Sequence, residues 1–398
     1  NPHSTPTPNP NPTPTPTPDQ LVEEMGRPAA MRTYISPISP PISPLYLPLY
    51  LPYIKPVFKY FEERTPGTVT ETQESSITWH YREADEDFGL RARTDGEVVE
   101  TVSAKGLFRT MAEAAWACAD PGIQYDDIIN DWHTNPETGR INASNPCSEY
   151  MSLDNSSCNL ASLNLMTFLK EDGTFDATRF AKSVELVITA MDISISFADF
   201  PTEAIGDTTR RHRQLGIGYA NLGALLMATG LPYDSDAGRS LAAAITSLMT
   251  GTAYKRSAEL AGVVGPYAGY ARNVDAHKRV MRKHASANDD VRTVSSLDGD
   301  VLKLAVKTWE ECLTTGEKNG WRNAQASVLA PTGTIGFMMD CDTTGIEPDF
   351  SLVKFKKLAG GGYFKIANQS LRPALSALDY EETQIDEVIA HVMGRLDL

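Results

Sequence analysis

The hydrophobic and polar positions of this chain follow a regular pattern only after about residue 90. Apolar residues at helical spacing predict a helix in SAKGLFRTMAEAAWACADPG, residues 103–122, with a serine cap before it and a Pro-Gly turn after it. QASVLAPTGTIGFMM, residues 325–339, is typical of a strand, a glycine loop and then a strand or helix. Further helices are predicted near residues 176–200, 208–229, 236–262, 300–315 and 380–393. Helices that alternate with short extended segments predict an α/β architecture.

The first 89 residues have a different composition. STPTPNPNPTPTPTP, residues 4–18, has proline at every second position, which excludes regular helices and favours polyproline II. Prolines also interrupt the apolar residues 35–54, so we expect residues 1–55 to be a disordered, Pro-rich N-terminus. Residues 56–89 form a separate segment, in which the alternation of SSITWHYR, residues 75–82, indicates a strand. Residues 90–398 have the pattern of a globular domain.

Charge and cysteine content narrow the functional class. The formal net charge is −15, which argues against nucleic-acid binding because phosphate recognition needs a basic surface. Five scattered cysteines do not form the dense, even set of a secreted disulfide framework, and they predict free thiols in a reducing cytoplasm. We find no secretory signal and no apolar run long enough to cross a membrane, so we expect a soluble cytoplasmic protein.

The candidate chemistry lies in NASNPCSEYMSLDNSSCNLASLNL, residues 142–165. Pro146 predicts a stiff loop around Cys147. Asn145 and Glu149 stand two positions on either side of Cys147, so in an extended loop the three side chains share a face. Together they offer hydrogen abstraction or nucleophilic attack at sulfur, orientation by an amide, and base chemistry at a carboxylate. The spacing alone leaves open a second interpretation, a buried Cys147 in a capped turn with a solvated Glu149.

Other thiols and histidines carry weaker signals. Cys158 has the context of a small buried hydrophobic residue, and two isolated thiols without a nearby histidine predict no metal site. His133 lacks an oxyanion signature beside it, so a hydrolase triad is a weak interpretation. Cys118 and Cys312 fall on apolar helix faces and are predicted core residues, while His133 and His212 are predicted to be structural.

Four motifs resemble one enzyme family. NPCSEYMSLDNSSCNLASLNL, residues 145–165, and LAPTGTIGFMMDCDTTGIEPDFSLVKFKKLAGGGYFKI, residues 329–366, resemble two stretches of the adenosylcobalamin-dependent (class II) ribonucleotide reductases. Residues 120–141 and 213–230 resemble the same family, so the resemblance runs from about Leu90 to the C-terminus. It implies part of a ten-stranded α/β barrel whose finger loop carries a transient thiyl radical. It also implies a ribonucleotide substrate, adenosylcobalamin as cofactor, a thioredoxin-like reductant and a possible homodimer.

The resemblance implies a role for each residue of the cysteine stretch. Cys147 would be the thiyl radical that takes a hydrogen atom from C3′ of the ribose, and Glu149 would accept the proton of the 3′-hydroxyl. Asn145 would hold a substrate hydroxyl, and Cys158 would be one of the two thiols that reduce the 2′ position and end as a disulfide. Substrate contacts are implied for the whole loop: Asn145, Pro146, Cys147, Ser148 and Glu149.

A second substrate segment is PTGTI, which comprises Pro331, Thr332, Gly333, Thr334 and Ile335. A tight turn with free backbone N–H groups and threonine hydroxyls can cradle an anion, although such a turn is weak evidence when it stands alone. The resemblance to the reductases implies that this loop binds the substrate phosphate.

The N-terminal segment departs from the family pattern. Residues 56–89 resemble a fragment of the trehalose-phosphate synthase/phosphatase family around ERTPG and WHYREAD, without the acidic DxDxT-type loop of its phosphatase chemistry. Family members are longer and carry a further redox cysteine and a C-terminal cysteine pair. These cysteines have no counterpart in this sequence, so Cys158 has no obvious disulfide partner. We therefore expect a truncated or chimeric reductase that alone is unstable or inactive in reductase turnover; the alternative is a non-catalytic chimeric gene product with no reductase turnover of its own.

Overall fold

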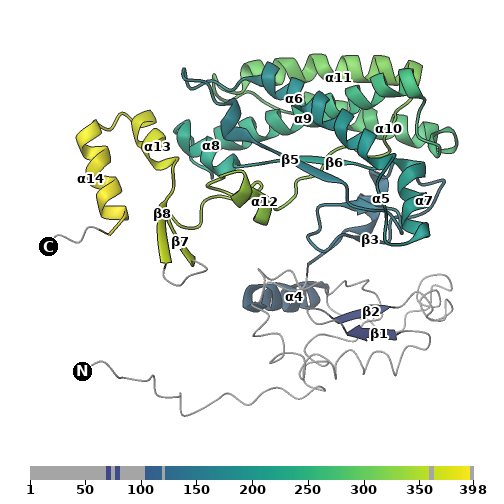
Figure 1. The fold of residues 1–398 in the computed structure, drawn as a ribbon, viewed down its shortest axis with the longest axis horizontal. Coiled ribbons are helices and arrows are strands. Elements are labelled where there is room, and N and C mark those ends of the chain that lie inside the picture. Colours follow the sequence, from purple (N-terminus) through teal and green to yellow (C-terminus); the bar gives the residue numbers. More distant parts are fainter. Residues whose placement is uncertain (1–68, 73–76, 81–103, 119–121, 358–362, 395–398) are drawn as a thin grey trace, which may run out of the picture. The chain divides into compact units, whose positions relative to one another are not determined.

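A computed structural model describes residues 69–72, 77–80, 104–118, 122–357 and 363–394 (Figure 1), and the chain divides between Gln124 and Tyr125 into two compact units. The first unit contains the antiparallel hairpin of β1 (Val69–Thr72) and β2 (Ile77–His80), and helix α4 (Ala104–Cys118). The helix confirms the prediction for residues 103–122, and β2 lies inside the predicted strand. The Pro-rich residues 1–55 and most of residues 56–89 lie outside the described residues.

The position of Cys118 differs from the prediction. The residue is exposed at the end of α4, and its thiol donates a hydrogen bond to the Ala114 carbonyl in the same helix. The neighbouring Trp116 is 92 % exposed. Placing Cys118 in a core was therefore wrong, because helical spacing shows that a helix has an apolar face but not that another element covers it.

Parallel strands form the centre of the second unit. β5 (Leu160–Asn164) pairs in parallel with β6 (Gly216–Ala220), and all five residues of β6 are buried. Residues 325–328 add an extended segment on the other side of β6, with hydrogen bonds from Leu215 N to Gln325 O, Ile217 N to Ala326 O and Val328 N to Ile217 O. The PTGTI loop begins at Pro331, separated from the end of this segment by two residues.

Small residues in β6 permit the close approach of its neighbours. A Cβ atom on Gly216 would lie 2.6 Å from Leu160 Cδ2, and one on Gly218 would lie 2.7 Å from the Val328 carbonyl oxygen. Larger residues would separate β6 from β5 or from the 325–328 segment.

Replacing Gly218 by Ala is expected to lower the free energy of unfolding by about 1–3 kcal/mol, because the new methyl group meets backbone that cannot rotate away. Urea unfolding measures the change. Gly299→Ala is the matched control: its Cβ would meet nothing within 4 Å at the first residue of a helix, so stability should hold or rise slightly. Equal stability of the Gly218→Ala variant and the unsubstituted protein would contradict the expectation.

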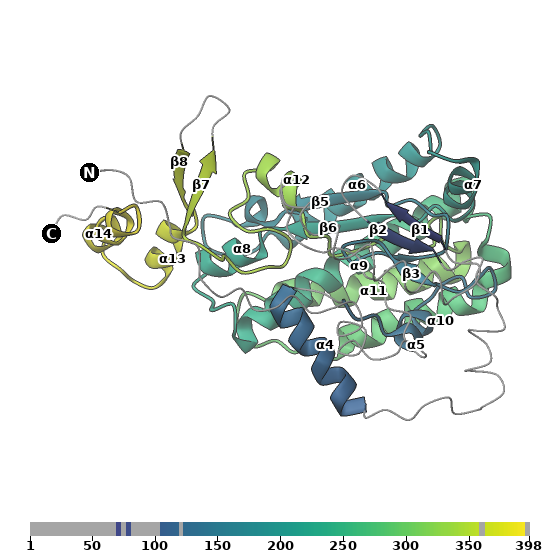
Figure 2. The same ribbon diagram turned by 90° about the horizontal axis from the view of Figure 1, so that it is seen from below.

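Long helices cover the parallel strands and supply most of the core (Figures 1 and 2). Aspartate and serine side chains cap two of these helices: Asp176 accepts from Arg179 N, and Ser235 accepts from Gly238 N. α9 packs against both α11 and α6, and its buried residues include Ile245, Leu248 and Met249. The helices are α6 (Ala177–Ile195), α9 (Asp236–Val264), α10 (Tyr270–Asp289) and α11 (Gly299–Asn319).

Most of the predicted helices are confirmed. α6, α9, α11 and α14 (Glu382–Val392) lie where the apolar spacing placed helices. The single helix predicted for residues 208–229 is wrong, because it is divided into α7 (Glu203–His212), β6 and α8 (Leu222–Ala228). Arg213 and Asn221 adopt left-handed backbone conformations, with φ of 48° and 72°, and these break the chain on either side of β6. α10 was not predicted.

The α/β class is confirmed, and the remaining elements are short. Within the described ranges the strands form four two-stranded sheets and close no barrel. No helix in those ranges has the length and apolarity needed to span a membrane. The remaining elements are α5 (Asp126–Asp131), β3 (Ala143–Ser144), β4 (Met151–Ser152), the 3₁₀ helix η1 (Leu165–Phe168), α12 (Gly333–Met338), β7 (Val353–Lys357), β8 (Tyr363–Ala367) and α13 (Leu371–Ala377).

Candidate active site

The Cys147 loop, residues 145–150, closes a short antiparallel hairpin made by β3 and β4. Asn145 N donates to Tyr150 O at 3.0 Å, and Ser148 N donates to Asn145 O at 3.0 Å. Pro146 and Cys147 occupy the turn between these bonds, and Ser148 has a left-handed φ of 65°. The loop is therefore held by its own backbone, in agreement with the stiffness predicted from Pro146.

The Asn145 side chain has a fixed orientation in this loop. Its Oδ1 accepts a hydrogen bond from Tyr150 N at 2.9 Å. Because a backbone N–H can only donate, the oxygen of the amide must face inward, and Nδ2 is the end that can serve a ligand. Asn145 can therefore donate a hydrogen bond to a substrate oxygen.

Tyr150 joins the Cys147 loop to the PTGTI segment. Its side chain is 1 % exposed and packs in a small cluster with Val328 and Ala330. Ala330 directly precedes Pro331, so this contact brings together two stretches that lie about 180 residues apart in the sequence. Both predicted substrate segments therefore belong to one region of the second unit.

Cys147, Glu149 and Cys158 interact electrostatically. Partial burial and the Glu149 carboxylate raise the pKa of the Cys147 thiol. The pKa of Cys158 is raised to about 11, mainly by burial and to a smaller extent by the charges of Glu149 and Cys147. Both thiols are exposed on the second unit and are protonated at neutral pH. Two S–H groups thus lie near one carboxylate.

The Glu149 carboxylate has an unused acceptor. Its Oε2 atom is buried, and none of the described residues donates a hydrogen bond to it. An unpaired buried oxygen is costly, and such atoms concentrate where a ligand or a proton is to be received. The alternative interpretation from the sequence, a buried Cys147 beside a solvated Glu149, is wrong, because here the thiol is exposed and the carboxylate oxygen is buried.

Replacing Glu149 by Gln should speed alkylation of Cys158 and Cys147 by iodoacetamide at pH 8, by roughly two- to tenfold. Removing the negative charge favours the thiolate, so the pKa of each thiol falls and the reactive fraction rises at a fixed pH. Peptide mass spectrometry over time measures each cysteine separately. Cys341 is the internal control. Burial, Asp342 and Asp340 raise its pKa to about 11, so the loss of the Glu149 charge should leave its alkylation rate unchanged. Slower alkylation of Cys158 would contradict the prediction.

The PTGTI segment forms a turn followed by a short helix. Thr332 is buried with a left-handed φ of 52°, an uncommon conformation for a β-branched residue, and α12 begins at Gly333. The first hydrogen bond of this helix runs from Gly336 N to Thr332 O at 2.9 Å. The N–H groups of Gly333, Thr334 and Ile335 therefore precede the helical ladder, and these three residues are exposed.

Cys312 and the two histidines have the structural positions predicted for them. Cys312 is fully buried in the main core. His133 Nε2 bonds to the Gly139 carbonyl at 2.8 Å, and His212 Nδ1 bonds to the Thr208 carbonyl at 3.0 Å. Burial lowers the pKa of His133 to about 4, so its ring is neutral at physiological pH.

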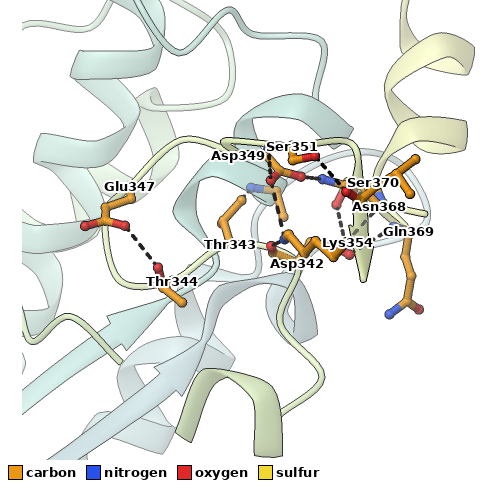
Figure 3. A network of polar contacts seen from close by, with 12 residues as sticks. Asp342, Thr343, Thr344, Glu347, Asp349, Ser351, Lys354, Asn368, Gln369 and Ser370 are labelled. Carbon is orange, nitrogen blue, oxygen red and sulfur yellow. Dashed lines mark hydrogen bonds and ion pairs between the residues drawn. The ribbon is translucent and has the colours of Figure 1, made fainter. Parts of the chain in front are cut away.

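A polar network that the sequence analysis missed holds the segment after α12 (Figure 3). The Asp342 carboxylate accepts hydrogen bonds from Gln369 N at 2.9 Å and from Ser370 N and Oγ at 3.1 and 2.8 Å. Asp349 pairs with Lys354 at 3.4 Å. These contacts tie the base of the β7–β8 hairpin to residues 342–349. The acidic run in MMDCDTTGIEPD was the only signal in the sequence, and it does not indicate which residues complete the network.

Comparison with known proteins agrees with this arrangement. The family model described as ribonucleotide reductase, barrel domain, matches residues 56–396. That range includes residues 56–89, whose resemblance to the trehalose-phosphate family stays a prediction.

Relatives called vitamin B12-dependent ribonucleotide reductase include one from Streptomyces avermitilis, 68% identical over 309 residues, which are 77% of this chain and 32% of that protein. Another, from Agrobacterium fabrum, is 48% identical over 332 residues, which cover 79% of this chain and 26% of the relative. A vitamin B12-dependent ribonucleoside-diphosphate reductase from Mycobacterium tuberculosis is 31% identical over 265 residues, 67% of this chain and 32% of the relative. The chain spans about a third of the length of these relatives or less. Because the family model matches most of its residues, the chain belongs to the ribonucleotide reductase barrel-domain family.

Proposed function

We propose that this chain carries the substrate-reducing site of a ribonucleotide reductase, which converts ribonucleotides to 2′-deoxyribonucleotides for DNA synthesis by a thiyl-radical mechanism. The observation that carries the proposal is the grouping of an exposed Cys147 thiol, a second thiol at Cys158 and a buried, unpaired Glu149 oxygen. The names of the relatives, which describe vitamin B12-dependent reductases, support the same reaction.

Cys147 acts first, as the group that removes hydrogen from C3′ of the ribose. In this step the S–H bond forms, the C3′–H bond breaks, and the unpaired electron moves from sulfur to C3′. Adenosylcobalamin supplies, when bound, the radical chemistry that oxidises the thiol, which no side chain of the site performs unaided. The Cys147 thiol fits such a cofactor, because it is protonated, exposed and held on a stiff loop.

Glu149 and Asn145 act on the neighbouring hydroxyl group. The buried Oε2 of Glu149 accepts the proton of the 3′-hydroxyl, which promotes charge and spin delocalisation at C3′. Asn145 Nδ2 donates to a substrate hydroxyl oxygen, since its Oδ1 is already engaged by Tyr150 N. A hydroxyl that donates to Glu149 and accepts from Asn145 is oriented from both sides.

Cys158 supplies reducing equivalents at the 2′ position. The overall step consumes two thiols and one ribonucleotide and yields a deoxyribonucleotide, water and a disulfide, so atoms and electrons balance. Cys158 provides one thiol, and its raised pKa keeps it in the protonated form that can donate hydrogen. A thioredoxin-like reductant would then restore the thiols.

The PTGTI segment binds the substrate phosphate. Pro331 and Thr332 form the turn, and the N–H groups of Gly333, Thr334 and Ile335 precede the ladder of α12. These exposed donors are the support for an anion site at this end of the loop. The five free cysteines are consistent with a cytoplasmic location, and we include assembly as a homodimer in the proposal.

Cleavage of the C3′–H bond tests the site apart from complete reduction. The chain is incubated with a C3′-deuterated ribonucleoside diphosphate, adenosylcobalamin and dithiothreitol, and mass spectrometry follows the loss of deuterium. We expect loss with the unsubstituted chain and none with Cys147→Ser. Full retention of deuterium by a folded chain that binds both nucleotide and cofactor would overturn the proposal. Several deoxyribonucleotides formed per chain would instead overturn the expectation that this chain alone completes no reductase turnovers.

A further inference from the structure

Three polar side chains connect the carboxyl ends of the parallel strands to the loop that contains α12. Asn164 is the last residue of β5, and Asn221 directly follows β6 and is 2 % exposed. Thr343 lies beyond α12 and is 3 % exposed. We call these three residues the strand-end relay.

The relay has one possible direction of hydrogen bonding. Thr343 N donates to Asn221 Oδ1 at 3.0 Å, and Asn221 Nδ2 donates to Asn164 Oδ1 at 3.0 Å. Asn164 Nδ2 then donates to the carbonyl of Met339, the C-cap residue directly after α12, at 3.1 Å. Backbone N–H groups fix the orientation of both side-chain amides. Thr343 N donates to Asn221 Oδ1, and Met166 N donates to Asn164 Oδ1 at 3.1 Å.

A second contact holds the other end of α12. Thr332 Oγ1 accepts a hydrogen bond from Gly345 N at 2.6 Å, which constrains Thr332 in its left-handed conformation. Gly345 also has a positive φ of 45°, and a Cβ atom there would lie 2.8 Å from the Ala330 carbonyl oxygen. Residues on either side of α12 are therefore fixed to the ends of the parallel strands and to each other.

We infer that Asn164, Asn221 and Thr343 are positioning residues that set the conformation of residues 331–345 through their mutual hydrogen bonds. Strands hold side chains in place more rigidly than loops do. By bonding the loop to the strand ends, the relay therefore restricts the positions of the N–H groups of Gly333, Thr334 and Ile335. That this geometry also sets the affinity for phosphate rests on the proposed function.

The Asn221→Asp variant tests the relay. It replaces Nδ2 by an oxygen that faces Asn164 Oδ1, so two acceptors oppose each other at a buried position. We expect amide hydrogen exchange in residues 331–345 to become about tenfold faster or more. Affinity for inorganic pyrophosphate, measured by calorimetry, should fall by a similar factor of about ten.

Asn273→Asp is the matched control. Asn273 is 1 % exposed, accepts from Glu137 N at 2.9 Å and donates from Nδ2 to the Gly269 carbonyl at 2.9 Å. The Asn273→Asp variant therefore loses a buried amide donor of the same kind, but outside the relay. It should leave both amide exchange in residues 331–345 and pyrophosphate affinity unchanged. Asn221→Gly is the second variant in case the carboxylate prevents folding, because glycine tolerates the φ of 72° and removes only the side chain.

The two readouts separate the relay from the phosphate assignment. Faster exchange limited to residues 331–345, with weaker pyrophosphate binding, supports both. Faster exchange in a protein whose unsubstituted form does not bind pyrophosphate supports the relay and removes the phosphate assignment. Unchanged exchange in Asn221→Asp or Asn221→Gly overturns the relay, whatever the affinity.

Discussion

Replacing Glu149 by Gln is expected to slow the release of deuterium from C3′ of a ribonucleotide by about 10²–10⁴-fold. Glutamine keeps the size and shape of the side chain but cannot accept the proton of the 3′-hydroxyl. Hydrogen abstraction by Cys147 then becomes slower, because abstraction from C3′ is easiest when the adjacent hydroxyl gives up its proton at the same time. This result depends on the proposed function.

The structure explains why this carboxylate in particular should matter. Glu149 Oε2 is buried and receives no hydrogen bond from the described residues, and the same carboxylate raises the pKa of both Cys147 and Cys158. Glu149→Gln should therefore have opposite effects in two assays on one variant. It slows C3′–H cleavage, and it speeds alkylation of the thiols.

The measurement compares single-turnover deuterium release in the unsubstituted chain, in Glu149→Gln and in a control. Glu171→Gln serves as the control, because Glu171 is exposed in a surface loop outside the site. Its rate should match that of the unsubstituted chain. A Glu149→Gln rate within about twofold of the unsubstituted rate would exclude Glu149 as the proton acceptor.

Replacing Asp192 by Ala is expected to lower the free energy of unfolding by about 3–5 kcal/mol. Asp192 Oδ1 accepts from Arg213 Nε at 2.7 Å and from Asn323 Nδ2 at 2.9 Å. Arg322 approaches Oδ2 at 3.4 Å. The side chains of Asp192 and Arg213 are each 8 % exposed, so removing the carboxylate leaves a buried guanidinium without its counterion.

This ion pair also joins the elements that carry the site. Asp192 lies on α6, Arg213 is the C-cap residue of α7 in the short connection to β6, and Asn323 precedes the 325–328 segment. Asn323 Nδ2 additionally donates to the Arg213 carbonyl at 2.9 Å, so one carboxylate organises the entry to two of the central strands. Loss of Asp192 should therefore loosen the strands as well as destabilise the fold.

Urea unfolding followed by circular dichroism measures the loss. Asp234→Ala is the matched control: its carboxylate pairs with Arg239 at 2.8 Å but is 97 % exposed, so the change should stay within about 1 kcal/mol. The double variant Asp192→Ala with Arg213→Met removes both buried charges and should recover part of the stability. A loss below about 1 kcal/mol in Asp192→Ala would show that the buried pair contributes little.

Local features of the chain could be predicted from the sequence. Apolar spacing located α6, α9, α11 and α14, because a helix that covers a core repeats its apolar residues every three or four positions. Pro146 predicted the stiff Cys147 loop, because proline restricts its own backbone and that of the residue before it. The motifs around Cys147 and Pro331 identified the family that the comparisons later showed.

Contacts between distant segments were decided by the tertiary structure. The sequence did not show that Cys118 would be exposed, that Glu149 Oε2 would be buried, or that Arg213 and Asn221 would divide residues 208–229. Burial and hydrogen-bond partners depend on which elements pack together, and such pairings join residues far apart in the chain. Asn164, Asn221 and Thr343 lie far apart in the sequence, and only folding brings them into one set of hydrogen bonds.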